Sequence, residues 1–213
     1  MTHISFKHLP APTLSRLPGY LHYLKKANDE GYASISCTHL AQIFRYDPTQ
    51  IRKDLQAAGA RGRAKIGYCT EELITVLEEF LGWNNVTDAF LAGAGNLGAA
   101  LLGYSDFFEV GLNITAVFDK DRRKTGTKLF GRVVLDLYEM EDLIKRMHIR
   151  IGIIAVPAAS AQSVAEIMVR SGVKGIWNFA PRELSVPETV VVENAQLSSS
   201  LSILKAKIKE KFL

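Results

Sequence analysis

The chain has 213 residues, of which 47% are hydrophobic and 23% charged, and its formal net charge is +4. This is the composition of an ordinary globular protein with one or two domains and enough apolar residues for real cores. The first twenty residues lack the apolar region of a signal peptide, and no run approaches the ~18 apolar residues of a membrane span. We therefore expect a cytoplasmic protein, with Cys37 and Cys69 reduced and with no metal site.

The first part of the chain has the pattern of short helices. Leu17, Leu21 and Leu24 lie at helical spacing and predict one amphipathic helix. A strand-like piece at 32–35 precedes a second helix, for which Ser36 is the predicted N-cap.

A three-residue turn, "RYD" (45–47), then leads into a third helix. Asp47 is a good N-cap, Pro48 suits the first helical position, and Gln50 stands where a capping box would place it. Two short helices joined by such a turn form the helix-turn-helix pattern. Apolar residues at 51, 55 and 58 face inward, so the outward side chains that we predict to bind DNA are Thr49, Gln50, Arg52, Lys53 and Gln56.

The stretch "ARGRAKIGY" (60–68) is long enough for a small hairpin, the wing of a winged helix. We predict that Arg61, Arg63 and Lys65 near its tip also bind DNA. Residues 45–65 hold six basic and two acidic side chains, so their net charge of +4 equals that of the whole chain. Such a local concentration of basic charge is the footprint of a DNA-binding surface. A helix ending at Gly82 completes the winged-helix order, which we assign to residues 1–84.

The stretch "GAGNLG" (93–98) has the G-x-G-x-x-G pattern between an apolar strand and an apolar helix. In a dinucleotide-binding fold the first glycine permits a tight turn, the second lets the backbone approach a pyrophosphate, and the third lets helix and strand pack closely. The helix N-terminus favours the anion. We therefore predict a cofactor site at Gly93, Ala94, Gly95, Asn96, Leu97 and Gly98.

Asp119 ends the next predicted strand, 21 residues after Gly98. Its carboxylate is expected to accept hydrogen bonds from ribose hydroxyls and to favour NAD over NADP. Lys120, which we include in the cofactor site, and the basic residues at 122–124 follow directly and are able to soften that preference.

The rest of the chain alternates strand and helix patterns, as in a doubly wound parallel sheet, which we assign to 85–196. The loop "AVPAAS" (155–160) follows a strand at the edge where such sheets bind ligands, so Val156 and Pro157 are predicted cofactor contacts. Pro157 either borders the nicotinamide or is a plain loop proline. Residues 197–213 form a basic amphipathic helix with nothing obvious left to cover, and we expect a partner chain to bury it. The predicted fold class is therefore α/β, with an N-terminal winged helix-turn-helix domain, a Rossmann-type domain and a C-terminal helix.

Several motifs occur in one order: "RLPGYLHYL", "QIRKDL", "GAGNLGAALLGY", "FDKDRRKTGTKLFG", "IGIIAVPA", "GIWNFAP" and "VVVENAQL". With them the chain resembles, over nearly its whole length, the Rex family of redox-sensing transcriptional repressors. The resemblance implies a homodimer with domain-swapped C-terminal helices, NAD(H) as cofactor, and a palindromic operator from which NADH releases the repressor.

The resemblance also implies a redox-switch network at positions 16, 104 and 196, with Tyr104 near the cofactor. The family has an aspartate at the third position, whereas this chain has Gln196, which cannot make a charge-assisted pair with Arg16. Ala57 and Ala58 stand where the family usually has aromatic residues. The change at position 196 concerns redox sensing, and the changes at positions 57 and 58 concern operator preference.

Two other functions stay open at the level of sequence. An NAD-dependent dehydrogenase would need a proton donor or acceptor beside the nicotinamide. Four of the five histidines lie in the N-terminal region, and His148 lies at the amino end of a predicted strand. A CoA-binding module is the other alternative, because the Rossmann part resembles succinyl-CoA synthetase-like domains. Asp119 and the winged helix argue against it, so we predict a repressor and no catalytic residue.

Overall fold

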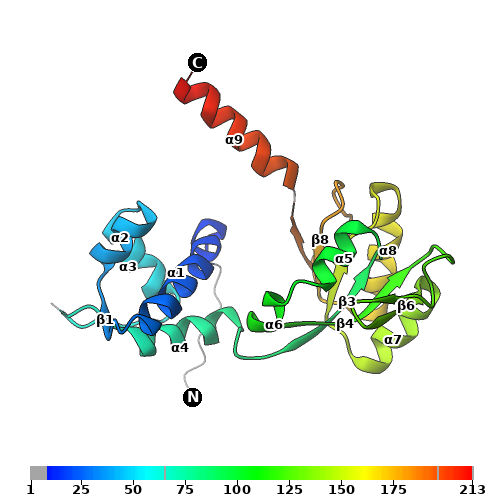
Figure 1. The fold of residues 1–213 in the computed structure, drawn as a ribbon, viewed down its shortest axis with the longest axis horizontal. Helices are drawn as coiled ribbons and strands as arrows, with labels where there is room; N and C mark the ends of the chain where they lie inside the picture. Colours follow the sequence, from blue (N-terminus) through cyan, green and yellow to red (C-terminus); the bar gives the residue numbers. More distant parts are fainter. Residues whose placement is uncertain (1–8, 65, 196, 213) are drawn as a thin grey trace. The chain divides into compact units, whose positions relative to one another are not determined.

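The computed structural model describes residues 9–64, 66–195 and 197–212. The chain divides into two compact units, residues 1–85 and 86–213 (Figure 1). Lys65 and Gln196, two of the predicted functional residues, lie outside the described residues.

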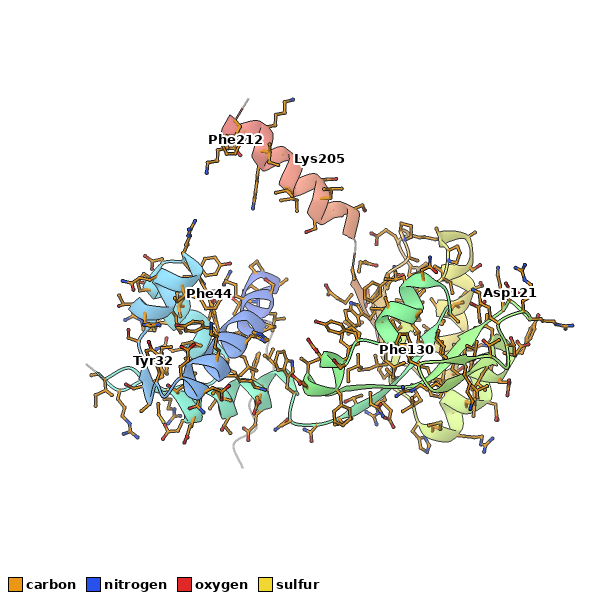
Figure 2. All side chains as sticks on the ribbon, in the orientation of Figure 1. Tyr32, Phe44, Asp121, Phe130, Lys205 and Phe212 are labelled. Atoms are coloured by element: carbon orange, nitrogen blue, oxygen red, sulfur yellow. The ribbon has the colours of Figure 1, made fainter. Side chains whose placement is uncertain are left out.

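The first unit has the element order of a winged helix. Its elements are α1 (Ala11–Asp29), β1 (Ser34–Ile35), α2 (Cys37–Phe44), α3 (Pro48–Ala57), β2 (Tyr68–Cys69) and α4 (Thr70–Leu81), and β1 pairs with β2 in antiparallel orientation. The predicted stripe on α1 forms the centre of the core, because Leu17, Leu21 and Leu24 are fully buried. Phe44, labelled in Figure 2, packs edge-on against Tyr20 with ring centroids 4.9 Å apart. Together these side chains hold α2 against α1.

The helix-turn-helix follows from local capping. The Ser36 side chain accepts a hydrogen bond from the backbone N–H of His39, and Asp47 accepts one from that of Thr49. Arg45 ends α2 in the left-handed conformation, with φ of 56°. The capping box expected at Gln50 does not form, because the Gln50 amide donates instead to Asp54, one turn further along α3.

The wing is a tight hairpin closed by two backbone hydrogen bonds between Arg63 and Gly67, of 2.7 and 2.9 Å. Gly67 has φ of +95°, and a Cβ there would lie 2.4 Å from the carbonyl oxygen of Ile35. The base of the wing therefore passes so close to β1 that a side chain is excluded.

The second unit is built on a seven-stranded sheet with strand order β5-β6-β4-β3-β7-β8-β9. Its strands are β3 (Thr87–Ala92), β4 (Leu112–Asp119), β5 (Lys128–Leu129), β6 (Arg132–Asp136), β7 (Ile151–Ile154), β8 (Gly175–Asn178) and β9 (Val191–Asn194). All neighbouring strands pair in parallel except β5, a two-residue edge strand antiparallel to β6 that the sequence did not predict. The remaining order is that of the doubly wound fold, with β3 at its centre.

Helices cover both faces of this sheet (Figure 1). They are α5 (Asn96–Leu102), α6 (Asp106–Glu109), the 3₁₀ turn η1 (Leu137–Glu139), α7 (Met140–Met147) and α8 (Ala158–Ser171). Alternate residues of β3 enter two separate cores: Phe90 and Ala92 pack with α7 and α8, whereas Ala89 and Leu91 pack with α5. This two-sided burial explains the uninterrupted apolar run of β3.

The chain ends in α9 (Leu197–Phe212), a basic helix whose Lys205 and Phe212 side chains are labelled in Figure 2. Every side chain described on α9, from Ser198 to Phe212, is exposed in the single chain. Among the described residues, no helix is long and apolar enough to cross a membrane.

Candidate functional site

The glycine loop joins β3 to α5, and a Cβ atom would meet different surroundings at each of its three glycines. Gly93 has φ of +108°, and a Cβ there would lie 2.5 Å from the carbonyl oxygen of Ala155. A Cβ on Gly98 would lie 1.8 Å from the carbonyl oxygen of Gly93, so close packing of helix and loop requires glycine. A Cβ on Gly95 would meet no protein atom within 4 Å, which leaves that backbone open to a ligand.

A cavity of about 440 Å³ lies at the carboxyl ends of β3, β4 and β7. The order of the strands reverses at this point of the sheet, where doubly wound folds bind their ligands. Its lining includes eight of the predicted cofactor residues: Gly93, Gly95, Asn96, Leu97, Asp119, Lys120, Val156 and Pro157. It also includes Asp121, Lys124, Leu137, Ser160, Phe179 and Pro181, which our prediction left out.

Ala94 and Gly98 were also predicted to contact the cofactor, and neither lines this cavity. The Ala94 backbone N–H donates a 2.9 Å hydrogen bond to the Asp119 carboxylate, so this residue orients a side chain that lines the cavity. Gly98 allows the close packing described above. Both residues therefore shape the crevice from outside it.

Asp119 is the charged centre of the crevice and only 9% exposed. One carboxylate oxygen accepts from the Lys124 ammonium and the Ala94 N–H, each at 2.9 Å, and the other accepts from the Asp121 N–H at 2.9 Å. Burial by itself would raise the pKa of Asp119, but the hydrogen bonds from Lys124, Asp121 and Ala94 outweigh it and lower that pKa. The carboxylate is therefore ionised at neutral pH and held in one orientation.

Tyr104 lies apart from this crevice in the structure. It lines a separate concavity with Leu101, Phe107 and Phe108, and its ring meets that of Phe107 edge-on at 4.8 Å. The residue is 54% exposed, and a hydrogen bond with Asp106 raises the pKa of its phenol. A single chain thus does not bring Tyr104 to the cavity where the cofactor residues gather.

The predicted DNA-binding residues that the structure describes lie on a solvent-facing surface of the first unit. On α3, Thr49, Arg52, Lys53 and Gln56 are exposed and Gln50 is partly buried, and the wing residues Arg61 and Arg63 are exposed. Arg52 and Gln56 of α3 line one concavity of about 490 Å³ together with Arg63 of the wing. The structure thus brings helix and wing to a shared basic surface, as a winged helix requires for DNA.

Beneath this surface lies a buried polar cluster centred on Asp54, which sequence reasoning treated only as a negative charge. Asp54 is 1% exposed and accepts hydrogen bonds from Arg16, Thr13, Tyr20 and Gln50. Arg16 binds the carboxylate in a bidentate manner, since Nε and Nη2 each donate a 2.7 Å hydrogen bond to one of its oxygens. Burial by itself would raise the pKa of Asp54, but the hydrogen bonds outweigh it and lower that pKa, and the bond from Arg16 has the largest effect among them.

The cluster also bears on the predicted redox-switch residue Arg16. Its guanidinium lies within the first unit, paired with Asp54 and stacked 5.6 Å over the ring of Tyr46. The pKa of Arg16 is raised, chiefly by its hydrogen bond to Asp54, so this side chain stays charged. The cluster therefore joins α1 to α3 through a charged pair.

Fold and sites together define a class of protein: a winged-helix DNA-binding unit combined with a Rossmann unit that has a dinucleotide-type crevice. Family models agree with this division. Residues 8–56 match the model for a putative DNA-binding protein N-terminus, and residues 84–182 match that for a CoA binding domain.

Curated proteins and solved structures identify the family. The redox-sensing transcriptional repressor Rex of Treponema denticola is 42% identical over 94% of this chain and 96% of its own length. Rex of Carboxydothermus hydrogenoformans is 41% identical over 94% and 97%. The structure of the Rex-family repressor RSP in complex with β-NAD⁺ and operator DNA matches with a TM-score of 0.91 at 36% identity, covering 96% of this chain and 94% of RSP. The structure of RSP with β-NADH matches with a TM-score of 0.86 at 35% identity, covering 95% of each chain.

This chain belongs to the Rex family of redox-sensing transcriptional repressors. The predicted family and fold class are thereby confirmed. Membership makes the chain a transcriptional regulator and not an enzyme, which decides against the dehydrogenase alternative.

Proposed function

We propose that this chain represses transcription by binding operator DNA through α3 and the wing, and that NADH bound in the crevice of the second unit lowers its operator affinity. The observation that carries the proposal is that one chain holds both a basic helix-and-wing surface and an Asp119-centred crevice. The relative RSP has been solved with operator DNA and β-NAD⁺, and with β-NADH.

The residues of the crevice fit a dinucleotide. The open backbone at Gly95 gives room for a pyrophosphate, and the ionised Asp119 is an acceptor for ribose hydroxyls. Val156 and Pro157, which follow β7, also line the cavity and offer an apolar border for the nicotinamide. When bound, NAD(H) supplies the redox state that the repressor reads, because its two forms differ by one hydride at that ring.

The α3 and wing residues have distinct parts in DNA binding. Arg52, Lys53, Arg61 and Arg63, with Lys65, supply the charge that holds the phosphate backbone. Thr49, Gln50 and Gln56 are polar and uncharged, and so are suited to base edges in the major groove.

The protein works as a cytoplasmic homodimer on a palindromic operator. The exposed apolar side chains of α9, Leu201, Leu204, Ile208 and Phe212, support this, because a stable helix buries such side chains against a partner. We assign residues 1–84 to DNA binding, 85–196 to NAD(H) binding and 197–213 to the helix swapped between protomers. A two-fold axis in the protein would match the symmetry of its operator.

Arg16, Tyr104 and Gln196 form the proposed link between cofactor state and DNA affinity. In the first unit, Nε and Nη2 of Arg16 donate hydrogen bonds to Asp54, which fixes the orientation of the guanidinium. The neutral Gln196 offers that arginine a dipole in place of a charge. To move the protein from 1:99 to 99:1 between two states, NADH needs ~5.5 kcal/mol of differential affinity.

The test is fluorescence polarisation with a labelled palindromic A·T-rich duplex, titrated with protein at one salt concentration with NADH, NAD⁺ or no cofactor. We expect NADH to weaken operator binding much more than NAD⁺ does. A scrambled duplex of the same composition controls for binding to phosphates alone. If operator affinity is the same with NADH and with NAD⁺, the proposal that the protein senses the redox state of the cofactor is refuted.

A further inference from the structure

The loop after β4 carries four basic residues, and the structure gives three of them different roles. Asp121, labelled in Figure 2, lies in this loop and holds Arg123, whose side chain is 89% exposed, through a 2.8 Å ion pair. Lys120 donates a 2.9 Å hydrogen bond to Ser160 on α8. Lys124 turns inward and forms a 2.9 Å ion pair with Asp119. One cation is therefore fixed at the carboxylate of the crevice.

The Asp119–Lys124 pair is part of the cavity, since both residues line it. The Asp119 side chain is 11% exposed and that of Lys124 is 39% exposed, so the ammonium lies on the more accessible side of the pair. A group that approaches Asp119 from the cavity therefore meets a carboxylate whose charge is largely balanced by a neighbouring ammonium. An unpaired aspartate at this place would repel a phosphate much more strongly.

We propose that Lys124 is a specificity residue of the crevice: by neutralising Asp119 it lets the protein bind a dinucleotide that carries a 2′-phosphate, such as NADPH, and so limits the discrimination between NADH and NADPH. This inference rests on the proposed function, because it assumes that the adenosine ribose lies at Asp119. Lys124 attracts the phosphate dianion of NADPH, whereas the uncharged 2′-hydroxyl of NADH gains little from a second cation.

A purely structural role for Lys124 makes a different prediction. If the lysine did no more than hold Asp119 in its orientation, its removal would weaken NADH and NADPH alike. The ratio of the two dissociation constants therefore separates the two roles, whereas the affinity for either cofactor alone does not.

The experiment is isothermal titration of the full-length protein with NADH and with NADPH, for the wild type and for Lys124→Met. We expect Lys124→Met to raise the dissociation constant for NADPH at least tenfold more than that for NADH. The matched control is Arg123→Met, which removes the same charge from the same loop outside the cavity and should keep the ratio within about twofold. Both variants are compared with the wild type by thermal unfolding, and Lys124→Arg, which keeps the charge, should keep a near-wild-type ratio.

Salt dependence gives a second measurement. Wild-type affinity for NADPH should fall more steeply with KCl than affinity for NADH, and Lys124→Met should remove that difference. An unchanged ratio in Lys124→Met would overturn the inference while leaving the proposed function intact. Failure of the wild type to bind NADH at all would instead overturn the proposed function, and the inference with it.

Discussion

The buried carboxylate of Asp54 is expected to contribute much of the stability of the DNA-binding unit. Asp54→Ala removes the acceptor of five hydrogen bonds of 2.7–3.1 Å and leaves Arg16, whose side chain is 16% exposed, without its counter-ion. Breaking a buried ion pair costs ~3–5 kcal/mol, and partial rehydration of Arg16 places this case near the lower end. The lost bond from Tyr20 adds ~1 kcal/mol, so we expect about 4 kcal/mol in total. Small domains have only ~5–15 kcal/mol of stability, so this unit would approach its unfolding threshold.

The assay is urea denaturation followed by tryptophan fluorescence. Trp83 lies in the first unit and Trp177 in the second, so a Trp177→Phe background reports on the first unit alone. Asp29→Ala, which removes an exposed carboxylate from the end of α1, is the control and should change stability by no more than ~0.5 kcal/mol. A loss below ~1 kcal/mol for Asp54→Ala would refute the reasoning.

The same cluster makes a prediction about pH. Because the pKa of Asp54 is lowered in the folded protein, its contribution is complete above the ordinary carboxyl pKa of ~3.9 and is lost as the pH falls through the lower folded value. The difference in unfolding free energy between the wild type and Asp54→Asn should therefore be largest at neutral pH and shrink in acid. A difference that stayed constant down to pH ~2 would contradict an ionised Asp54.

Four further changes test the sites. Gly95→Ala should leave the unfolding temperature unchanged but weaken NADH binding at least tenfold. Gly98→Ala, whose Cβ would meet the Gly93 carbonyl, should lower both the unfolding temperature and the NADH affinity. If calorimetry finds that Gly95→Ala leaves NADH affinity unchanged, the cofactor does not approach the backbone at Gly95. Arg52→Ala should weaken operator binding and reduce the slope of log affinity against log salt concentration by ~1 per lost phosphate contact, measured by polarisation across a KCl series. The control Arg146→Ala should leave this slope unchanged. An unchanged slope for Arg52→Ala would exclude a phosphate contact. Deletion of 197–213 should yield a monomer by light scattering, and a truncated chain that remained dimeric would refute the swapped-helix assignment.

Much of this protein was predictable from the sequence because the interactions responsible are local. Ser36 and Asp47 cap the helices that follow them, and each cap joins residues two or three positions apart. The glycine pattern of the cofactor loop predicted the crevice for a similar reason, since a turn of few residues needs particular backbone conformations. The resemblance to the Rex family, which the comparisons confirm, rested on such short motifs taken in order.

Local rules also misled in places. Gln50 has the spacing of a capping-box residue, whose side-chain oxygen would accept from the Asp47 N–H. Its amide nitrogen instead donates to the buried carboxylate of Asp54 one turn further along, and this charge-assisted bond holds the side chain there. The edge strand β5 and the short helix α6 have too few residues to produce a periodic signal. Both elements exist because the surrounding sheet gives them partners.

The tertiary structure alone decided which charges act together. Arg16 and Asp54 are 38 residues apart in sequence, and no periodic pattern relates them; packing of α1 on α3 brings them within 2.7 Å. Four basic residues follow Asp119, but the path of the loop, which periodicity does not determine, turns Lys124 inward and Arg123 outward. Composition and spacing thus determined the folds of the two units and the class of each site, because those depend on neighbours along the chain. Pairing of buried charges depends on desolvation and geometry, which exist only once distant segments have packed.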